Sequence, residues 1–195
     1  MEGHAFLKPA FIIPVAGGAV VLLGVVVALV TIAAGKRKVR ALRDWVRGAY
    51  ALWTGGEDSG TWDQARASQS LNDWYGATGP GAFWQVIAEL RGGGQTGNQA
   101  WDDVRALDLL RIGRAAQYID DDACWTEAGK IARELRRRYR SWDELAAGFE
   151  QGMNAWQRRR GVTDPAQLGR VQRHLPALRQ ELWPRVRYDA TFPDV

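Results

Sequence analysis

The chain opens with a long run of apolar residues that contains no charged side chain. The run lies between Lys8 and Lys36, and a helix of this length can cross the hydrocarbon core of a bilayer, which is about 30 Å thick. We therefore predict a single-pass transmembrane helix over residues 10–35, preceded by a short extracytoplasmic segment, residues 1–9. Basic residues follow the run instead of preceding it, which favours an uncleaved anchor over a signal peptide.

The rest of the chain has hydrophobic residues at helical spacing and no alternating strand pattern. We expect an all-α protein: a basic juxtamembrane segment over residues 36–47, an all-helical domain of about six or seven helices over 48–183, and an irregular C-terminal tail over 184–195. The pattern predicts helices over residues 39–53, 61–76, 80–91, 98–119, 120–139, 141–156 and from 163 onward, with an interruption near 176.

Local capping signals mark the starts of several predicted helices. Thr61 with Gln64 and Ser141 with Glu144 fit the capping-box pattern. Residues 120–122 offer carboxylates to the free amides of the next helix. The glycine-rich segments TGG and GGG follow no predicted strand and precede no lysine, so they are interpreted as turns and not as phosphate-binding loops.

The charge of the chain is concentrated beside the predicted anchor. The formal net charge is +4, yet residues 51–195 contain 19 Lys and Arg against 20 Asp and Glu. The predicted membrane-surface residues are Lys36, Arg37, Lys38, Arg40 and Arg43. Basic residues after a span remain in the cytoplasm and attract anionic lipid headgroups. We therefore expect the lipid bilayer as a partner, no nucleic acid, and a cytoplasmic C-terminal domain.

Two further features bear on partners and cofactors. Gly17, Gly24 and Thr31 recur every seven residues in the predicted span. Such a stripe of small residues can let two helices associate, although small residues are common in spans in general. The chain has one cysteine, Cys124, and two histidines, which excludes an intramolecular disulfide and disfavours a transition-metal site. We expect no metal and no cofactor.

The predicted helix over 98–119 carries charged residues in an unusual place. Asp108 and Arg111 fall inside the apolar stripe that includes Trp101, and Arg105 lies close by on the same wheel. Buried charges must be paired and hydrogen-bonded. One interpretation is a structural ion pair that joins this helix to a neighbour; the other is a pocket in which an arginine binds an anionic ligand.

Four carboxylates are weak candidates for catalysis. Asp102, Asp103, Asp143 and Glu144 could serve as paired acids and bases or bind magnesium. All four are expected in the first turns of helices, where carboxylates stabilise the free amides. Capping is therefore the favoured explanation.

Tryptophan is abundant, with ten residues in the chain. Core packing explains those at helical core spacing, and an aromatic groove for a partner helix or peptide is the alternative. The residues at core spacing are Trp45, Trp74, Trp84, Trp101, Trp125, Trp142 and Trp156.

Two stretches, AWDDVRALDLLRIGRAAQYIDDDACW and SWDELAAGFEQGMNAW, give the chain a family resemblance. Over about residues 40–156 it resembles the bacterial family called domain of unknown function 1266. Gln117 stands where we expect glycine in the family pattern, and Met153 where we expect a basic residue. The matching positions are Trp101, Asp102, Arg105, Ala106, Arg111, Tyr118, Ile119, Ser141, Trp142, Gly152 and Trp156. The resemblance implies an all-helical fold and names no reaction. Some members of the family are soluble, so the anchor looks like an added targeting device, and we expect it in the bacterial inner membrane.

These features favour a non-enzymatic protein-binding or accessory module at the membrane. The expected contact residues are Arg105, Asp108, Arg111, Trp101 and Trp142. A membrane-tethered hydrolase or nucleotide-handling enzyme that uses the four carboxylates is one alternative. An immunity protein of a toxin system is another.

Overall fold

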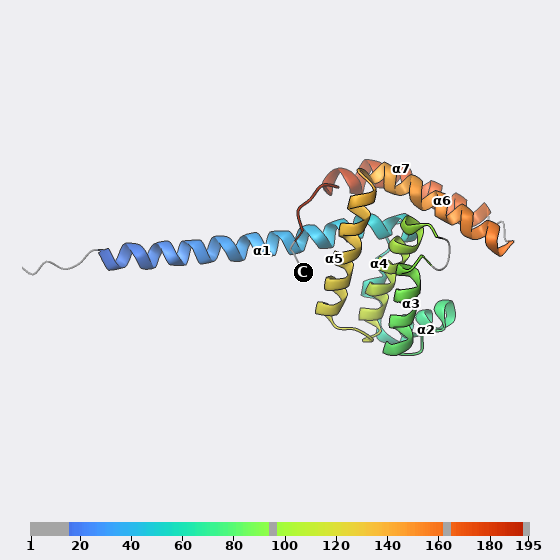
Figure 1. The fold of residues 1–195 in the computed structure, drawn as a ribbon, viewed down its shortest axis with the longest axis horizontal. Helices are drawn as coiled ribbons and strands as arrows, with labels where there is room; N and C mark the ends of the chain where they lie inside the picture. The colour runs from blue at the N-terminus through green and yellow to red at the C-terminus, as the bar shows by residue number, and fades with distance from the viewer. Residues whose placement is uncertain (1–15, 94–96, 162–164, 193–195) are drawn as a thin grey trace, which may run out of the picture. The chain divides into compact units, whose positions relative to one another are not determined.

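The structure is a computed structural model that describes residues 16–93, 97–161 and 165–192 (Figure 1). For residues 16–34, 165–168 and 170 it describes the backbone alone. In this part of the chain the protein is all-α, 80% helical, with seven α-helices and no strand. The all-α part of the predicted fold class is thus confirmed. The chain divides into two units, residues 1–37 and 38–195.

The first unit, residues 1–37, contains the whole of the predicted anchor. Helix α1, Ala16–Thr54, begins here and ends in the second unit. Among the helices that the structure describes, none is long and apolar enough to span a membrane. Residues 10–15 of the predicted span lie outside the described residues, as does the N-terminal segment 1–9, and residues 16–34 are described by their helical backbone alone, without the side chains of the small-residue stripe.

The second unit contains the other helices, and their bounds follow the predicted pattern closely. After α1 come η1 (Ser59–Thr61), α2 (Gln64–Tyr75), α3 (Pro80–Arg91), α4 (Gln99–Ala115), α5 (Asp121–Arg138), α6 (Trp142–Arg160), α7 (Pro165–Ala177), η2 (Leu178–Leu182) and η3 (Trp183–Arg185). The interruption predicted near residue 176 is a π-helical turn, η2, directly after α7.

Helix α4 is the centre of this unit. It contacts η1, α2, α3, α5 and α6, and Figure 1 shows it between α3 and α5. Every residue from 100 to 113 is buried. The sequence predicted one apolar stripe with an exposed face, but a helix surrounded on all sides has no such face. The charged residues within 100–113 are therefore buried as well.

The helix caps combine predicted and unexpected residues. Helix α2 is capped by the Asp63 carboxylate, which accepts a hydrogen bond from the Arg66 amide at 2.8 Å, and not by Thr61, which ends η1. At α6 the Ser141 hydroxyl accepts from the Glu144 amide at 3.1 Å, as predicted. Asp120 caps α5 in the predicted way.

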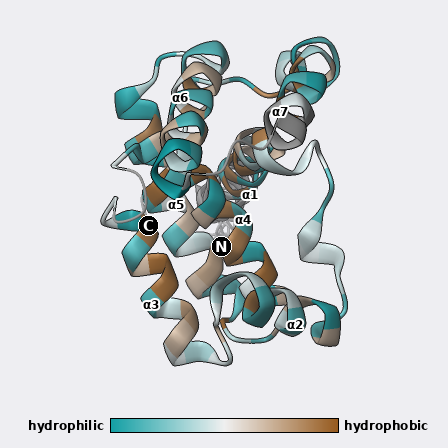
Figure 2. Cartoon of the chain, turned by 90° about the vertical axis from the view of Figure 1, so that its right-hand side faces the viewer, coloured by the Kyte–Doolittle hydropathy of each residue, from teal (hydrophilic) through white to brown (hydrophobic). Residues whose placement is uncertain are grey.

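The core of the unit is rich in tryptophan, and Figure 2 shows hydrophobic residues gathered on α4 and hydrophilic residues over much of α2 and α6. Trp45 and Trp101 are fully buried. Trp74 and Trp84, which the helical spacing assigned to the core, are instead 59% and 38% exposed. The prediction was wrong for these two residues because spacing alone does not tell which side of a short helix faces its neighbours.

Residues 186–192, which follow η3, contain no helix or strand and pack on the core. The Trp142 indole donates to the Val186 carbonyl at 2.9 Å, and the Trp45 indole donates to the Tyr188 carbonyl at 3.0 Å. Val186 and Phe192 are buried. Residues 186–192 therefore cover the aromatic cluster between α1 and α6.

Candidate functional site

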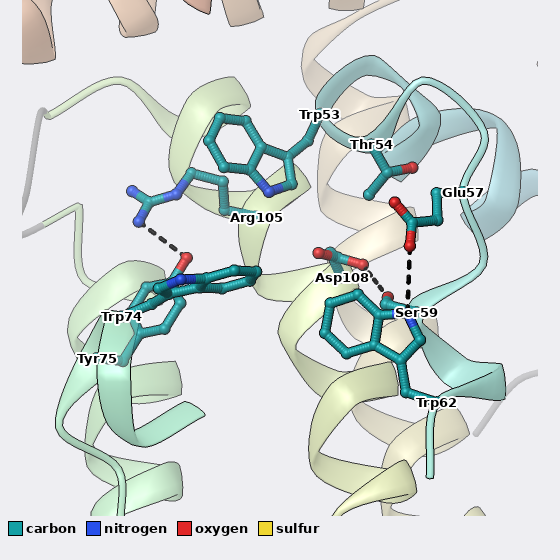
Figure 3. Close-up of a pocket in the computed structure, with 9 residues that line it drawn as sticks. All are labelled: Trp53, Thr54, Glu57, Ser59, Trp62, Trp74, Tyr75, Arg105 and Asp108. Carbon is teal, nitrogen blue, oxygen red and sulfur yellow. Dashed lines mark hydrogen bonds between the residues drawn. The ribbon is translucent and has the colours of Figure 1, made fainter. Parts of the chain in front are cut away.

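A cavity of about 490 Å³ opens between the end of α1, the turn η1, α2 and α4. Its volume lies within the range of small-molecule and side-chain binding pockets. Four aromatic residues and five polar ones surround it (Figure 3). The lining residues are Trp53, Thr54, Glu57, Ser59, Trp62, Trp74, Tyr75, Arg105 and Asp108.

Aromatic rings form the walls of this cavity, which we call the aromatic pocket. Trp53 comes from the end of α1, Trp62 follows η1, and Trp74 and Tyr75 end α2. The rings of Trp62 and Trp74 meet edge to face with centroids 6.2 Å apart. The large exposed fraction of Trp74 places it at the rim, where it can contact a ligand without rearrangement of the core.

Arg105 lies at one end of the aromatic pocket. Its guanidinium donates to the Tyr75 hydroxyl at 3.0 Å and lies 5.1 Å from the Trp101 ring centre and 5.9 Å from that of Trp53. These contacts combine a hydrogen bond with cation–π attraction, which fixes the side chain against the wall. Trp101 thus contacts the Arg105 guanidinium but does not itself line the pocket.

Asp108 lies at the other end and is 4% exposed. One carboxylate oxygen, Oδ1, accepts a hydrogen bond from the Ser59 hydroxyl at 2.5 Å. Burial raises the pKa of Asp108 to about 7, and the nearby negative charge of Glu57 acts in the same direction, while the bond from Ser59 opposes them. Asp108 is therefore partly protonated near neutral pH.

Arg111 is buried behind this end of the pocket and does not line it. Its guanidinium lies 3.9 Å from the centre of the Tyr50 ring and forms an ion pair with Asp58. The sequence offered a structural ion pair as one explanation for the buried charges of this helix. The structure provides one, but with the loop after α1 as the neighbour.

The two acidic residues near the start of α4 belong to a different part of the core. Asp102 and Asp103 are both buried, and Asp103 lies beyond the first turn, so capping does not explain it. The Asp103 carboxylate accepts a hydrogen bond from the side-chain amide of Gln99 at 2.7 Å and lies 3.8 Å from the Arg91 guanidinium. Burial raises the pKa of Asp103 to about 7.

The acidic residues at the start of α6 lie on the surface. Asp143 accepts from the Arg179 guanidinium at 2.8 Å, and Glu144 accepts from the Arg140 amide at 2.7 Å. A shallower cavity of about 430 Å³ contains Asp143 and Trp142, and Trp142 stacks on Trp183. None of the four candidate carboxylates lines the aromatic pocket, so the structure does not bring them together as an acid–base pair there.

The remaining groups that could react or bind a metal are the cysteine thiol and the His, Asp and Glu side chains. Cys124 is buried and its thiol donates weakly to the Leu110 carbonyl. Burial raises the pKa of this thiol to about 11, which keeps it protonated. Among the described residues no group of three or more His, Cys, Asp and Glu side chains is placed to hold a metal ion.

Sequence reasoning identified Arg105 and Asp108 but missed the rest of the pocket lining. Glu57 and Ser59 lie in TGGEDSG, a segment interpreted only as a turn, and Trp62 follows it. The available signal was the local density of tryptophan around this turn, which is compatible with the aromatic groove considered above.

A comparison with protein families identifies a family over most of the chain. A family model described as "Protein of unknown function (DUF1266)" matches residues 37–183. The chain belongs to this family. The DUF1266 match covers the aromatic pocket and extends beyond the resemblance seen over residues 40–156, through α7 to Trp183. Comparisons with curated proteins and with solved structures found no match.

Proposed function

We propose that this DUF1266 protein is a non-enzymatic binding module, held at the bacterial inner membrane with its helical domain in the cytoplasm, and that the aromatic pocket receives a protein partner. One observation carries the proposal. Trp74 is 59% exposed at the rim of a cavity whose interior contains the buried charges of Arg105 and Asp108. An exposed tryptophan beside buried polar groups is typical of interaction hot spots.

The composition of the aromatic pocket supports recognition over catalysis. Its charged groups already have partners that orient them: Tyr75 for Arg105, Ser59 for Asp108 and Trp62 for Glu57. The described lining contains no cysteine or histidine that could act as a nucleophile or a shuttle for protons. Rigid aromatic walls with a few fixed polar groups favour selective binding.

The membrane part of the proposal rests on the sequence. The uncharged run between Lys8 and Lys36 has the length of a span. Lys38 and Arg40 after it are exposed, and Arg43 is exposed as well, so these side chains are available to lipid headgroups.

Site-specific photo-crosslinking tests the proposal in the native membrane. A benzophenone amino acid is placed at Trp74 in the full chain and, as a matched control, at Trp84, an exposed tryptophan on α3 that does not line the pocket. We expect an ultraviolet-dependent protein adduct from position 74 and none of the same mass from position 84. The adduct is identified by mass spectrometry and its binding repeated with purified components.

The adduct should also disappear when the pocket is altered without disturbing the core. Trp62→Ala removes a pocket wall that is only partly buried, and this variant should fold while losing the adduct. Identical adducts from both positions, or none from position 74, would contradict the proposal.

A further inference from the structure

The polar groups of the aromatic pocket are separated by charge. Figure 3 shows the carboxylates of Glu57 and Asp108 on one side, while the Arg105 guanidinium is turned toward Tyr75 on the other. The lining residues contribute one more carboxylate than guanidinium groups. The end of the pocket near η1 is therefore acidic.

The two carboxylates have bonding capacity left toward the cavity. Asp108 accepts from Ser59 through Oδ1. The Glu57 carboxylate accepts from the Trp62 indole and from the Arg66 guanidinium, in each case through Oε1 at 3.3 Å. Among the described residues no Lys or Arg forms an ion pair with Asp108; the groups that act on it are Ser59 and Glu57. One oxygen on each carboxylate thus remains for a donor that enters the pocket.

The two carboxylates differ in their partners: Glu57 forms an ion pair with Arg66, whereas among the described residues Asp108 forms none. A carboxylate that is 4% exposed and lies near a second carboxylate is costly to ionise without a cation nearby. A ligand that brings a positive charge to this end removes the cost and gains two charge-assisted hydrogen bonds.

The aromatic walls favour a flat cation, a guanidinium, over an ammonium group. The chain itself provides an example, because the Arg66 guanidinium lies 4.1 Å from the Trp62 ring centre while it donates to Glu57. A guanidinium is flat, so it can stack on an indole and donate in its own plane at the same time. An ammonium group is a compact point charge that does not combine these two contacts as well.

We propose that the aromatic pocket binds an arginine side chain of the protein partner, with the guanidinium stacked on tryptophan and donating to Asp108 and Glu57. This inference rests on the proposed function, since it names the anchor by which that partner is recognised. Arg105 lies at the far end, where its guanidinium donates to Tyr75 and contacts the rings of Trp53 and Trp101, so it does not occupy the free oxygens of Asp108 and Glu57.

Calorimetric titration of the full chain in detergent micelles tests the inference directly. The probe is Nα-acetyl-arginine methylamide, and the control ligand is the citrulline analogue, which has the same shape and no charge. Agmatine tests whether a free small cation suffices. Asp108→Asn and Glu57→Gln are the test variants, and Asp143→Asn, which alters an exposed carboxylate outside the pocket, is the control variant.

We expect the arginine analogue to bind and the citrulline analogue to bind at least about tenfold more weakly. Asp108→Asn and Glu57→Gln should each weaken arginine binding, and Asp143→Asn should leave it unchanged. Since Glu57 is exposed, Glu57→Gln keeps the test decisive even if Asp108→Asn disturbs the fold.

Three results would overturn the inference: no binding of the arginine analogue, equal binding of both analogues, or arginine binding that neither pocket variant weakens. Strong binding of agmatine without binding of the capped arginine would overturn the assignment to a protein side chain. A protein adduct at position 74 without arginine binding would overturn this inference alone, whereas arginine binding without any adduct would contradict the proposed function and leave the cation site standing.

Discussion

Three buried charges on α4 are stabilised in three different ways. Arg111 has an anionic partner and an aromatic face, Asp103 has the Arg91 guanidinium and the Gln99 amide, and Asp108 has a serine hydroxyl. A hydroxyl bond compensates for the loss of hydration of a carboxylate less well than a cation does. Asp108 is therefore the residue at which ionisation should cost the fold most.

Asp108→Asn should raise the stability of the protein at pH 8 and change it little at pH 4. The pKa of Asp108 is about 7 in the folded protein against an ordinary value of 3.8, so between these values the native state binds more protons than the unfolded state. Stability from this group therefore falls as the pH rises through that window, by about 1–3 kcal/mol. The amide keeps an acceptor for Ser59 and does not ionise.

Urea unfolding of the full chain at a series of pH values measures this effect. The pKa of Asp103 is also raised to about 7. In the Asp108→Asn variant the free energy of unfolding should therefore still fall as the pH rises, but less steeply than in the parent. Asp143→Asn, at an exposed carboxylate, should reproduce the parent curve. A variant that is less stable than the parent at pH 8 would show that the ionised carboxylate stabilises the fold.

Arg111→Ala should destabilise the second unit by about 2–4 kcal/mol, because it leaves Asp58 without its cation and removes a guanidinium packed on Tyr50. The matched control is Arg179→Ala at an exposed ion pair, with an expected change below about 0.5 kcal/mol. Denaturant unfolding measures both.

A double-mutant cycle identifies the partner of Arg111. We expect a coupling energy with Asp58→Asn that exceeds the coupling with Asp108→Asn. The reverse order would mean that Arg111 pairs with Asp108 in solution.

Gln117→Gly should stabilise the protein by about 1 kcal/mol. Gln117 has a φ of 60°, in the left-handed region, directly after α4, and the following amide of Tyr118 donates back to the Gly113 carbonyl at 2.9 Å. This geometry is a helix C-terminal motif in which glycine is preferred. It also gives a physical reason for the glycine that the family pattern led us to expect. Thermal unfolding checks the gain, and Gln117→Ala, which retains the Cβ, should not reproduce it.

At the scale of the helices, the sequence predicts what is encoded locally. Pro80, Ser141 and the acidic residues before α5 mark helix starts because their interactions reach only three or four residues along the chain. Thr61 was the wrong cap because two acidic residues, Asp58 and Asp63, provide better acceptors nearby. Capping predictions fail where several candidates compete within one turn.

Contacts between distant segments could not be predicted in the same way. Arg105 and Asp108 were recognised because charged residues inside an apolar stripe are unusual. Their partners Tyr75 and Ser59 lie about 30 and 49 positions earlier in the chain, and no periodicity of one helix identifies them. The sequence predicts an irregular tail over residues 184–195, but the packing of residues 186–192 on Trp45 and Trp142 depends on the tertiary fold.

Gly152→Ala should destabilise the contact between α4 and α6 by about 1–3 kcal/mol. A Cβ at Gly152 would lie 2.3 Å from the Trp101 Cβ, too close for any real contact, and 2.7 Å from the Asn98 side chain. Neither atom can move far, since Trp101 is buried and Asn98 caps α4.

The control for this change is Gly81→Ala on α3, where an added Cβ meets no atom within 4 Å. That variant should be neutral or more stable by up to about 1 kcal/mol. Equal unfolding midpoints for the two variants would show that α6 does not approach α4 as closely as described.

At the scale of the whole molecule, the boundary between the two structural units lies next to the start of the family match. The second unit begins at Lys38, and the family match begins at residue 37. The same boundary follows the predicted anchor. A helical domain with its own core, joined to a segment of different composition, is consistent with an added membrane attachment.

A fragment of residues 38–195 should therefore fold alone and lose membrane attachment. It contains every residue that lines the aromatic pocket, so its unfolding temperature should lie within about 2–4 °C of the value for the full chain. In fractionated cells we expect the full chain to remain in the membrane pellet after an alkaline carbonate wash, because an apolar span is held by the hydrocarbon core, and the fragment to appear in the supernatant. Release of the full chain by carbonate would contradict the anchor, whereas an unfolded fragment would show that the second unit depends on residues before Lys38.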